Sequence, residues 1–140
     1  MARRAPLTFA TVAFVVTVLL HGLDHVLQDR GVGALTTEVL AGGTVIFALA
    51  ATMLALALRE HPQAPMFAAA VGLSTAIGVS LAHLAPHWSA FSDPYPDLSL
   101  GAWSWTVMLA EVAAALVLAA VGLRELRDRR PAARHAAGGA

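Results

Sequence analysis

The sequence contains no cysteine and no lysine. The absence of cysteine excludes disulfides, thiolate metal sites and cysteine nucleophiles, and the absence of lysine excludes Schiff-base chemistry on that side chain. Charged residues of both signs are also scarce. They make up 13% of the 140 residues, whereas 58% are hydrophobic, against about 45–50% in a typical soluble domain.

The few charges are unevenly distributed along the chain. Glu38 is the only charged residue between Arg30 and Arg59, and there is none between Glu60 and Asp93. A soluble domain of this length cannot cover its surface with so few charges, so we interpret the chain as an integral membrane protein. Because strand-like alternation is absent and the apolar runs are continuous, we expect helices.

Four apolar stretches have the length of about 20 residues that a membrane-spanning helix needs. They are bounded by turn-forming segments, notably "HPQAP" at 61–65 and "SDPYPDLSLG" at 92–101. The prediction is an all-α fold, an integral membrane four-helix bundle that forms one domain over residues 1–130. A disordered cytoplasmic tail is predicted over 131–140. The four predicted helices are 7–27, 37–58, 64–87 and 101–127.

The N-terminal segment "MARRAP" and the apolar run after it have some features of a secretory signal peptide. The residues that follow Leu20 include His21, Asp24 and His25, and these do not form the small-residue cleavage site of such a peptide. We therefore interpret this segment as an uncleaved first helix.

Arginine predicts the orientation in the cell membrane. Only Arg30 falls on the outer side of a four-helix topology, and by the positive-inside rule both termini are cytoplasmic. Three aromatic residues near the outer ends of the third and fourth helices fit an interfacial belt. The eight arginines on the inner side are Arg3, Arg4, Arg59, Arg124, Arg127, Arg129, Arg130 and Arg134. The aromatic residues are Trp88, Tyr95 and Trp103.

Histidines mark the outer ends of the first and third predicted helices. His21 and His25 are four residues apart, as are His83 and His87, and residues at this spacing share a helix face. Asp24 lies on the same face as His21 and His25. Because both helices run outward, the two clusters share one leaflet, and together they form a candidate metal site.

Further carboxylates accompany the histidines. Glu38 begins the second helix near the outer face, and Asp93 and Asp97 are expected to be turn residues of the outer loop. Glu111 lies in the middle of the fourth helix, where an unpaired charge costs about 2.5–3.5 kcal/mol. An ionisable group at that depth marks a functional site or a buried hydrogen-bonding residue.

Small residues suggest how the helices pack. Gly72, Ala76 and Ser80 recur at every fourth position of the third helix, and Gly42 and Gly43 lie near the start of the second. Such residues allow close helix contacts in membranes. A shift of 62 residues superimposes His21 on His83 and His25 on His87, which is consistent with duplication of a helix hairpin.

The leading functional hypothesis is a metal site in the outer leaflet. Zinc is the first choice, and copper and iron also accept imidazole ligands. If the site is catalytic, the metal would activate water for hydrolysis, with Asp24 or Glu38 as general base. The use of membrane histidines and an aspartate is similar to that of the intramembrane zinc hydrolases of the alkaline ceramidase and adiponectin-receptor group. Those proteins have seven helices and a different motif order, so no residue role is transferred.

Two alternatives remain open. A histidine from each cluster could ligate a b-type haem for electron transfer, although the doubled histidines are unneeded for one haem. The chain could instead be a non-enzymatic membrane assembly subunit that works as a homo-oligomer, with Glu111 at an interface. In every case the lipid bilayer is a partner, and no nucleic-acid partner is predicted.

Overall fold

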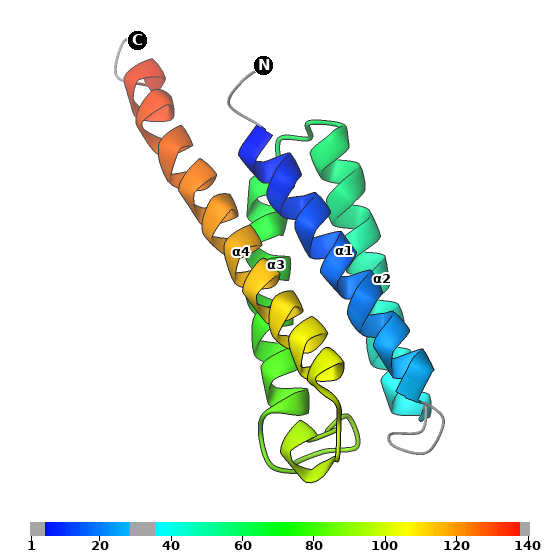
Figure 1. Ribbon diagram of the computed structural model, residues 1–140. Coiled ribbons are helices and arrows are strands. Elements are labelled where there is room, and N and C mark those ends of the chain that lie inside the picture. Colours follow the sequence, from blue (N-terminus) through cyan, green and yellow to red (C-terminus); the bar gives the residue numbers. More distant parts are fainter. Residues whose placement is uncertain (1–4, 29–35, 138–140) are drawn as a thin grey trace.

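The computed structural model describes residues 5–28 and 36–137, which form an all-helical bundle (Figure 1). Each of its four long helices is long and apolar enough to span a membrane, as the sequence predicts. A short 3-10 helix, η2 (Tyr95–Asp97), lies in the connection between the last two. The long helices are α1 (Ala5–Gln28), α2 (Thr37–Leu58), α3 (Ala64–His83) and α4 (Ala102–Ala137).

Two helix ends differ from the prediction. α3 ends at His83, before residue 87, because the chain turns at Leu84 and Pro86 follows. α4 continues beyond the predicted end at residue 127 through Ala137. Its last part consists mainly of alanine and arginine, which favour helix. Residues 138–140 of the predicted disordered tail lie outside the described residues.

α1 and α4 each bury one stripe of residues spaced three or four apart. This spacing follows from 3.6 residues per turn, which places such residues on one face. Most members are apolar, and all the polar ones except Thr11 lie toward the same end of the bundle. On α1 the buried stripe is Leu7, Ala10, Thr11, Phe14, Val18, His21 and Asp24. On α4 it is Ser104, Met108, Glu111, Ala115 and Leu118.

Glycine permits the close crossing of α3 and α4. A Cβ at Gly122 would lie 2.6 Å from the carbonyl oxygen of Pro65, and one at Gly72 would collide with the carbonyl oxygen of Ala115. The predicted small-residue contact therefore exists at Gly72. It is absent at Gly42 and Gly43 of α2, where an added Cβ would meet no atom within 4 Å.

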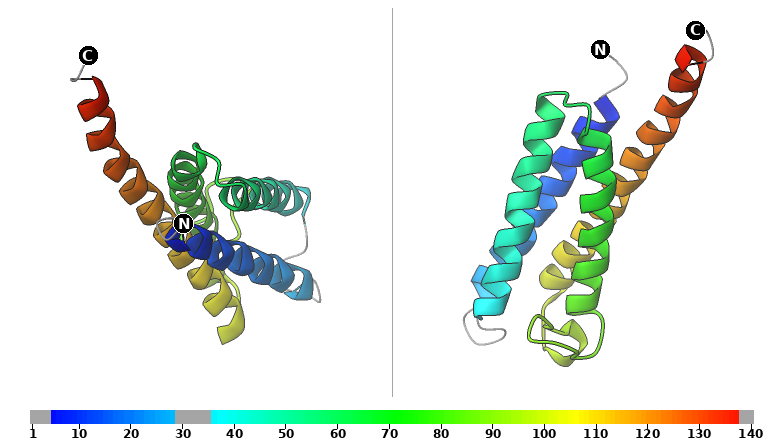
Figure 2. Two further views of the ribbon diagram at one scale, coloured as in Figure 1. Left: turned by 90° about the horizontal axis from the view of Figure 1, so that it is seen from above. Right: turned by 180° about the vertical axis from the view of Figure 1, so that it is seen from behind.

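The outer surface of the bundle is apolar. Phe9, Val45 and Leu58 are more than half exposed, as are several other large apolar side chains. An extensive exposed apolar surface of this kind indicates contact with a membrane or another protein rather than with water. Figure 2 shows from above and from behind that α2 lies at one side of the bundle, and only 11% of its membrane-length window is buried, so α2 has a wide free face.

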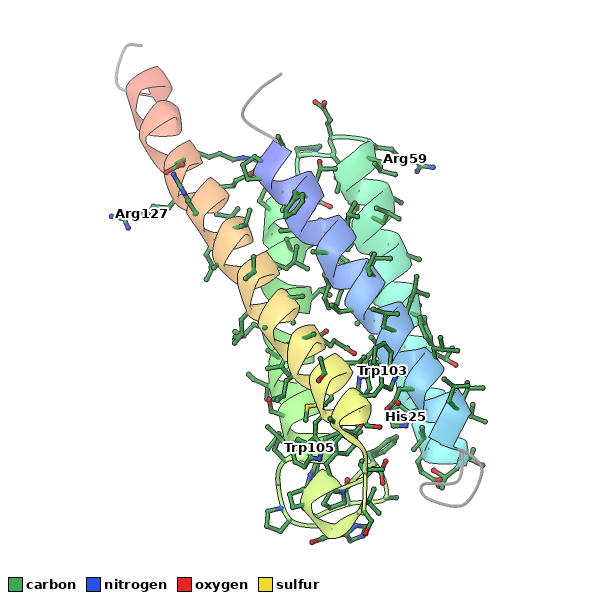
Figure 3. The ribbon with its side chains drawn as sticks, in the orientation of Figure 1. His25, Arg59, Trp103, Trp105 and Arg127 are labelled. Atoms are coloured by element: carbon green, nitrogen blue, oxygen red, sulfur yellow. The ribbon has the colours of Figure 1, made fainter. Side chains whose placement is uncertain are left out.

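The two ends of the bundle differ in charge. Ala5 of α1 and Ala137 of α4 lie at one end, to which Arg59 and Arg127 also belong (Figure 3). Arg3, Arg4 and Arg30 lie outside the described residues. The opposite end holds the connection between α3 and α4, whose Asp93 amide donates to the carbonyl oxygen of Ala82 at 2.9 Å.

Candidate metal centre

Three histidines converge at the end of the bundle away from Arg59. His21 and His25 lie near the C-terminal end of α1, and His83 is the last residue of α3. One possible ligand atom from each ring lies within 4.8 Å of those from the other two. The centroid of the His21 ring is 4.8 Å from that of His25 and 5.0 Å from that of His83. This group is compatible with a metal site.

His21 is buried and hydrogen-bonded through both ring nitrogens. Its Nδ1 lies 2.6 Å from Oε2 of Glu111, and its Nε2 lies 3.1 Å from the Tyr95 hydroxyl. A carboxylate only accepts, so Nδ1–H donates to Glu111 and the Tyr95 O–H donates to Nε2. The carboxylate thus fixes the tautomer in which the Nε2 lone pair is available.

His83 is held in the same way by a backbone group. Its Nδ1–H donates to the carbonyl oxygen of Asp93 at 3.1 Å, which assigns the lone pair to Nε2. The loop that contains Asp93 is tied back to α3 through its own amide bond to Ala82. Metal-ligating histidines usually donate their second N–H to a carboxylate or a backbone carbonyl. His21 and His83 each have such a partner.

A cavity of about 210 Å³ adjoins the three histidines, between α1, α2 and α3. The three rings and three carboxylate-bearing residues contribute to its wall, and the remaining wall is mostly apolar. The polar wall consists of His21, His25, His83, Glu38, Asp93 and Glu111. The cavity therefore places acidic groups beside the imidazoles in a mainly apolar enclosure.

Glu111 supplies a further polar atom that faces no protein group. The residue is 2% exposed, and its Oε1 has no hydrogen-bond partner among the described residues. Leaving a buried polar group unsatisfied costs about 1–3 kcal/mol, so a cation or water molecule bound in the cavity would stabilise Glu111. Glu111 also lines the cavity beside the three histidines.

Asp24 is buried beside the site but serves another contact. Its Oδ1 accepts a hydrogen bond from the Ser104 hydroxyl of α4 at 3.1 Å, and Asp24 is not part of the cavity wall. The position three residues after His21 turns it toward α4, whereas His25 lies toward α3. Glu38, in the first turn of α2, does line the cavity.

His87 does not join the other histidines. The prediction that His83 and His87 share a helix face is wrong because α3 ends at His83, and His87 is exposed in the following connection. The proposed equivalence of His25 and His87 fails for the same reason. Asp97 is also exposed, in η2.

Sequence reasoning missed the role of Tyr95. It is fully buried rather than part of an interfacial belt, and its ring lies 4.6 Å from that of His83 and 5.5 Å from that of Trp105. Trp88 and Trp103 are exposed, as such a belt requires. The Pro residues on both sides of Tyr95 mark a turn, but they do not indicate that the turn folds inward onto the histidines.

No family model, curated protein or solved structure matches this chain. Functional inference therefore rests on the chemistry and geometry of the site.

Proposed function

We propose that this chain is a membrane protein that binds a zinc ion at His21, His25 and His83. The convergence of three imidazoles from two helices carries this proposal. Three protein ligands and one open position are typical of catalytic zinc sites, whereas structural sites are closed by four. The cavity beside the rings gives the fourth position room for water or substrate.

Formation of the site requires only a small contraction. Two nitrogens bound to one zinc at about 2.0–2.1 Å in a tetrahedral arrangement lie about 3.4 Å apart, and the ring nitrogens here are within 4.8 Å of one another. The Tyr95 hydroxyl must leave the Nε2 lone pair of His21 for zinc to bind that atom.

Hydrolysis is the reaction class that this arrangement favours. The bound zinc would lower the pKa of a water molecule and polarise a substrate carbonyl. Glu38 lines the cavity and would accept the proton of that water, whereas Asp24 does not line it. Asp93 offers a second carboxylate-bearing residue in the same wall. Asp24 instead stabilises the contact between α1 and α4 through Ser104.

The haem alternative is less well supported. The cavity of about 210 Å³ is smaller than the roughly 300–1,000 Å³ of pockets that enclose drug-sized ligands. A porphyrin is larger than most drug-sized ligands. The hydrogen bonds that orient His21 and His83 would suit copper or iron as well as zinc. Zinc is preferred because hydrolysis needs no change of redox state.

We place the site in the outer leaflet of the cell membrane, with both termini cytoplasmic. The arginines at the other end of the bundle support this orientation through the positive-inside rule. The lipid bilayer would then cover the exposed apolar faces. The wide free face of α2 would also allow a homo-oligomer in the membrane.

Elemental analysis of the full-length protein, purified in detergent and equilibrated with buffered zinc, tests the proposal. We expect about one zinc per chain, lost in His21→Ala, His25→Ala and His83→Ala. His61→Ala, at the other end of the bundle, is the matched control and retains zinc. If wild-type protein takes up no metal, or if His61→Ala loses it equally, the proposal is wrong. A Soret band in the purified protein would support haem instead.

A further inference from the structure

The apolar part of the cavity indicates the class of molecule that the site binds, an inference that rests on the proposed function. Polar groups line one part of the cavity, and apolar side chains line the rest. The apolar wall consists of Val18, Val39, Ile46, Phe47, Val79 and Phe91. A hydrolase that acts on small polar molecules does not require so extensive an apolar wall beside its metal.

The cavity is elongated along α2. Its wall on this helix begins at Glu38 in the first turn and continues to Phe47. Nine residues of helix correspond to about 14 Å. The carboxylate of Glu38 is at the loop end, whereas Ile46 and Phe47 lie deeper along the helix. Along α2 the cavity wall therefore changes from a carboxylate near the helix start to hydrocarbon deeper in the bundle, and Phe47 lies level with Gly22, next to His21 on α1.

The side between α1 and α2 is closed at depth. A Cβ at Gly22 of α1 would lie 2.5 Å from the Cζ atom of Phe47, so the phenyl ring packs directly against the α1 backbone. A Cβ at position 22 would have to displace the end of this ring. A ligand therefore has no passage between these two helices at the level of Phe47.

The side between α2 and α3 is lined by glycines. Gly42 and Gly43 of α2 and Gly78 of α3 all belong to the cavity wall, and an added Cβ at any of them would meet no atom within 4 Å. Gly78 is five residues from the end of α3 and Gly42 is five from the start of α2. Both lie about 7.5 Å inside their helix ends, where a membrane-spanning helix contacts hydrocarbon.

We propose that this cavity binds a single-chain amphiphile that enters between α2 and α3 from the bilayer. Its chain lies along Val39, Ile46 and Phe47, and its oxygen-bearing head group faces the histidines. The volume of about 210 Å³ equals roughly seven water-sized volumes. This is enough for a short segment of one hydrocarbon chain and too little for the two chains of a diacyl lipid. The substrate class of the hydrolase is accordingly a fatty acyl compound.

Photo-crosslinking tests the inference. The probe is dodecanoic acid with a diazirine near the middle of its chain, within the segment that the cavity can hold, added to full-length protein in phosphatidylcholine vesicles. We expect labelling to concentrate on residues 39–47 and 78–82 and to be competed by unlabelled dodecanoate. Gly43→Leu and Gly78→Leu should each reduce labelling by roughly tenfold, because leucine would fill the space that the chain needs.

Ala41→Leu on α2 and Ala70→Leu on α3 are matched controls, since both positions are exposed outside the cavity. Labelling spread evenly over the exposed helix faces, or unchanged in both glycine variants, would overturn the inference. Zinc is measured in the same samples. Loss of labelling with zinc retained in the glycine variants supports the binding of the chain. Wild-type protein that is labelled in the cavity but holds no zinc contradicts only the metal centre.

Discussion

Nδ1 of His21 on α1 lies 2.6 Å from Oε2 of Glu111 on α4, and both side chains are buried. The two residues are 90 positions apart in the sequence, and their contact joins the first and last helices at the depth of the proposed metal centre. A short hydrogen bond to a carboxylate both orients the imidazole and makes it a stronger ligand. We therefore predict that Glu111 positions His21 for the metal, and its effect should be measurable apart from that of the ligands.

Glu111→Gln should weaken zinc binding without unfolding the bundle. The amide keeps the shape of the side chain but provides a weaker acceptor for Nδ1–H, and loss of such a partner typically lowers metal affinity by about 10- to 100-fold. Competition with a chelator of known affinity measures the change. Asp128→Asn, an exposed substitution at the other end of α4, is the control. Unchanged zinc affinity in Glu111→Gln would remove Glu111 from the site.

Tyr95→Phe should have the opposite effect on zinc affinity. In the present structure the Tyr95 hydroxyl holds the Nε2 lone pair of His21 at 3.1 Å, and zinc must displace it. The variant lacks this hydrogen bond, whose net contribution is about 0.5–1.5 kcal/mol. Zinc binding no longer has to break it, so the zinc affinity should rise by roughly two- to tenfold. The same chelator competition measures this rise in zinc affinity. Weaker binding would show instead that the hydroxyl stabilises the metal-bound state.

His87→Ala should retain full zinc stoichiometry, whereas His25→Ala should lose it. Both residues follow another histidine by four positions, but only His25 lies on a continuous helix with its partner. His87 is exposed beyond the end of α3 and cannot reach the cavity without refolding of the connection. Elemental analysis of the two purified variants measures the zinc bound per chain. Loss of zinc in His87→Ala would mean that α3 extends further in the membrane.

The sequence was sufficient to predict the four helices and to assign His21, His25 and His83 to the same end of the bundle, but not to show that their rings converge. Hydrophobic length defines a membrane helix, and the order of the helices brings the C-terminal ends of α1 and α3 to the same end. The sequence was insufficient at positions whose surroundings depend on the rotation of a helix about its axis or on the course of a loop. Asp24 and His25 are adjacent, yet one faces α4 and the other the cavity, because successive helix residues differ by about 100°.

Tyr95 and His87 show the same limit in the connection between α3 and α4. Both lie beside prolines in a polar segment, and nothing in the local pattern distinguishes the buried residue from the exposed one. The inward position of Tyr95 depends on packing against Trp105 and His83, which are contacts between distant parts of the chain. Hydropathy and periodicity describe single elements and contain no information about such contacts.

The orientation in the membrane can be tested by cysteine labelling, because the chain has no cysteine of its own. Ser99→Cys and His61→Cys replace exposed residues at opposite ends of the bundle. With both termini cytoplasmic, a membrane-impermeant maleimide should label position 99 on intact cells and position 61 only after permeabilisation. The reverse pattern would place the metal centre on the cytoplasmic side.

Adding one methyl group should lower stability at Gly122 but not at Gly43. Gly122→Ala places a Cβ against the backbone of Pro65, 2.6 Å from its carbonyl oxygen, and must push α3 and α4 apart. Such overpacking costs about 1–3 kcal/mol. Gly43→Ala meets no atom within 4 Å and gains up to about 1 kcal/mol from helix propensity. Thermal unfolding in detergent, followed by circular dichroism, should give a lower Tm for Gly122→Ala and an equal or higher Tm for Gly43→Ala. If both variants lose stability equally, α2 packs at Gly43 as closely as α3 packs on α4, and no opening for a hydrocarbon chain exists between α2 and α3.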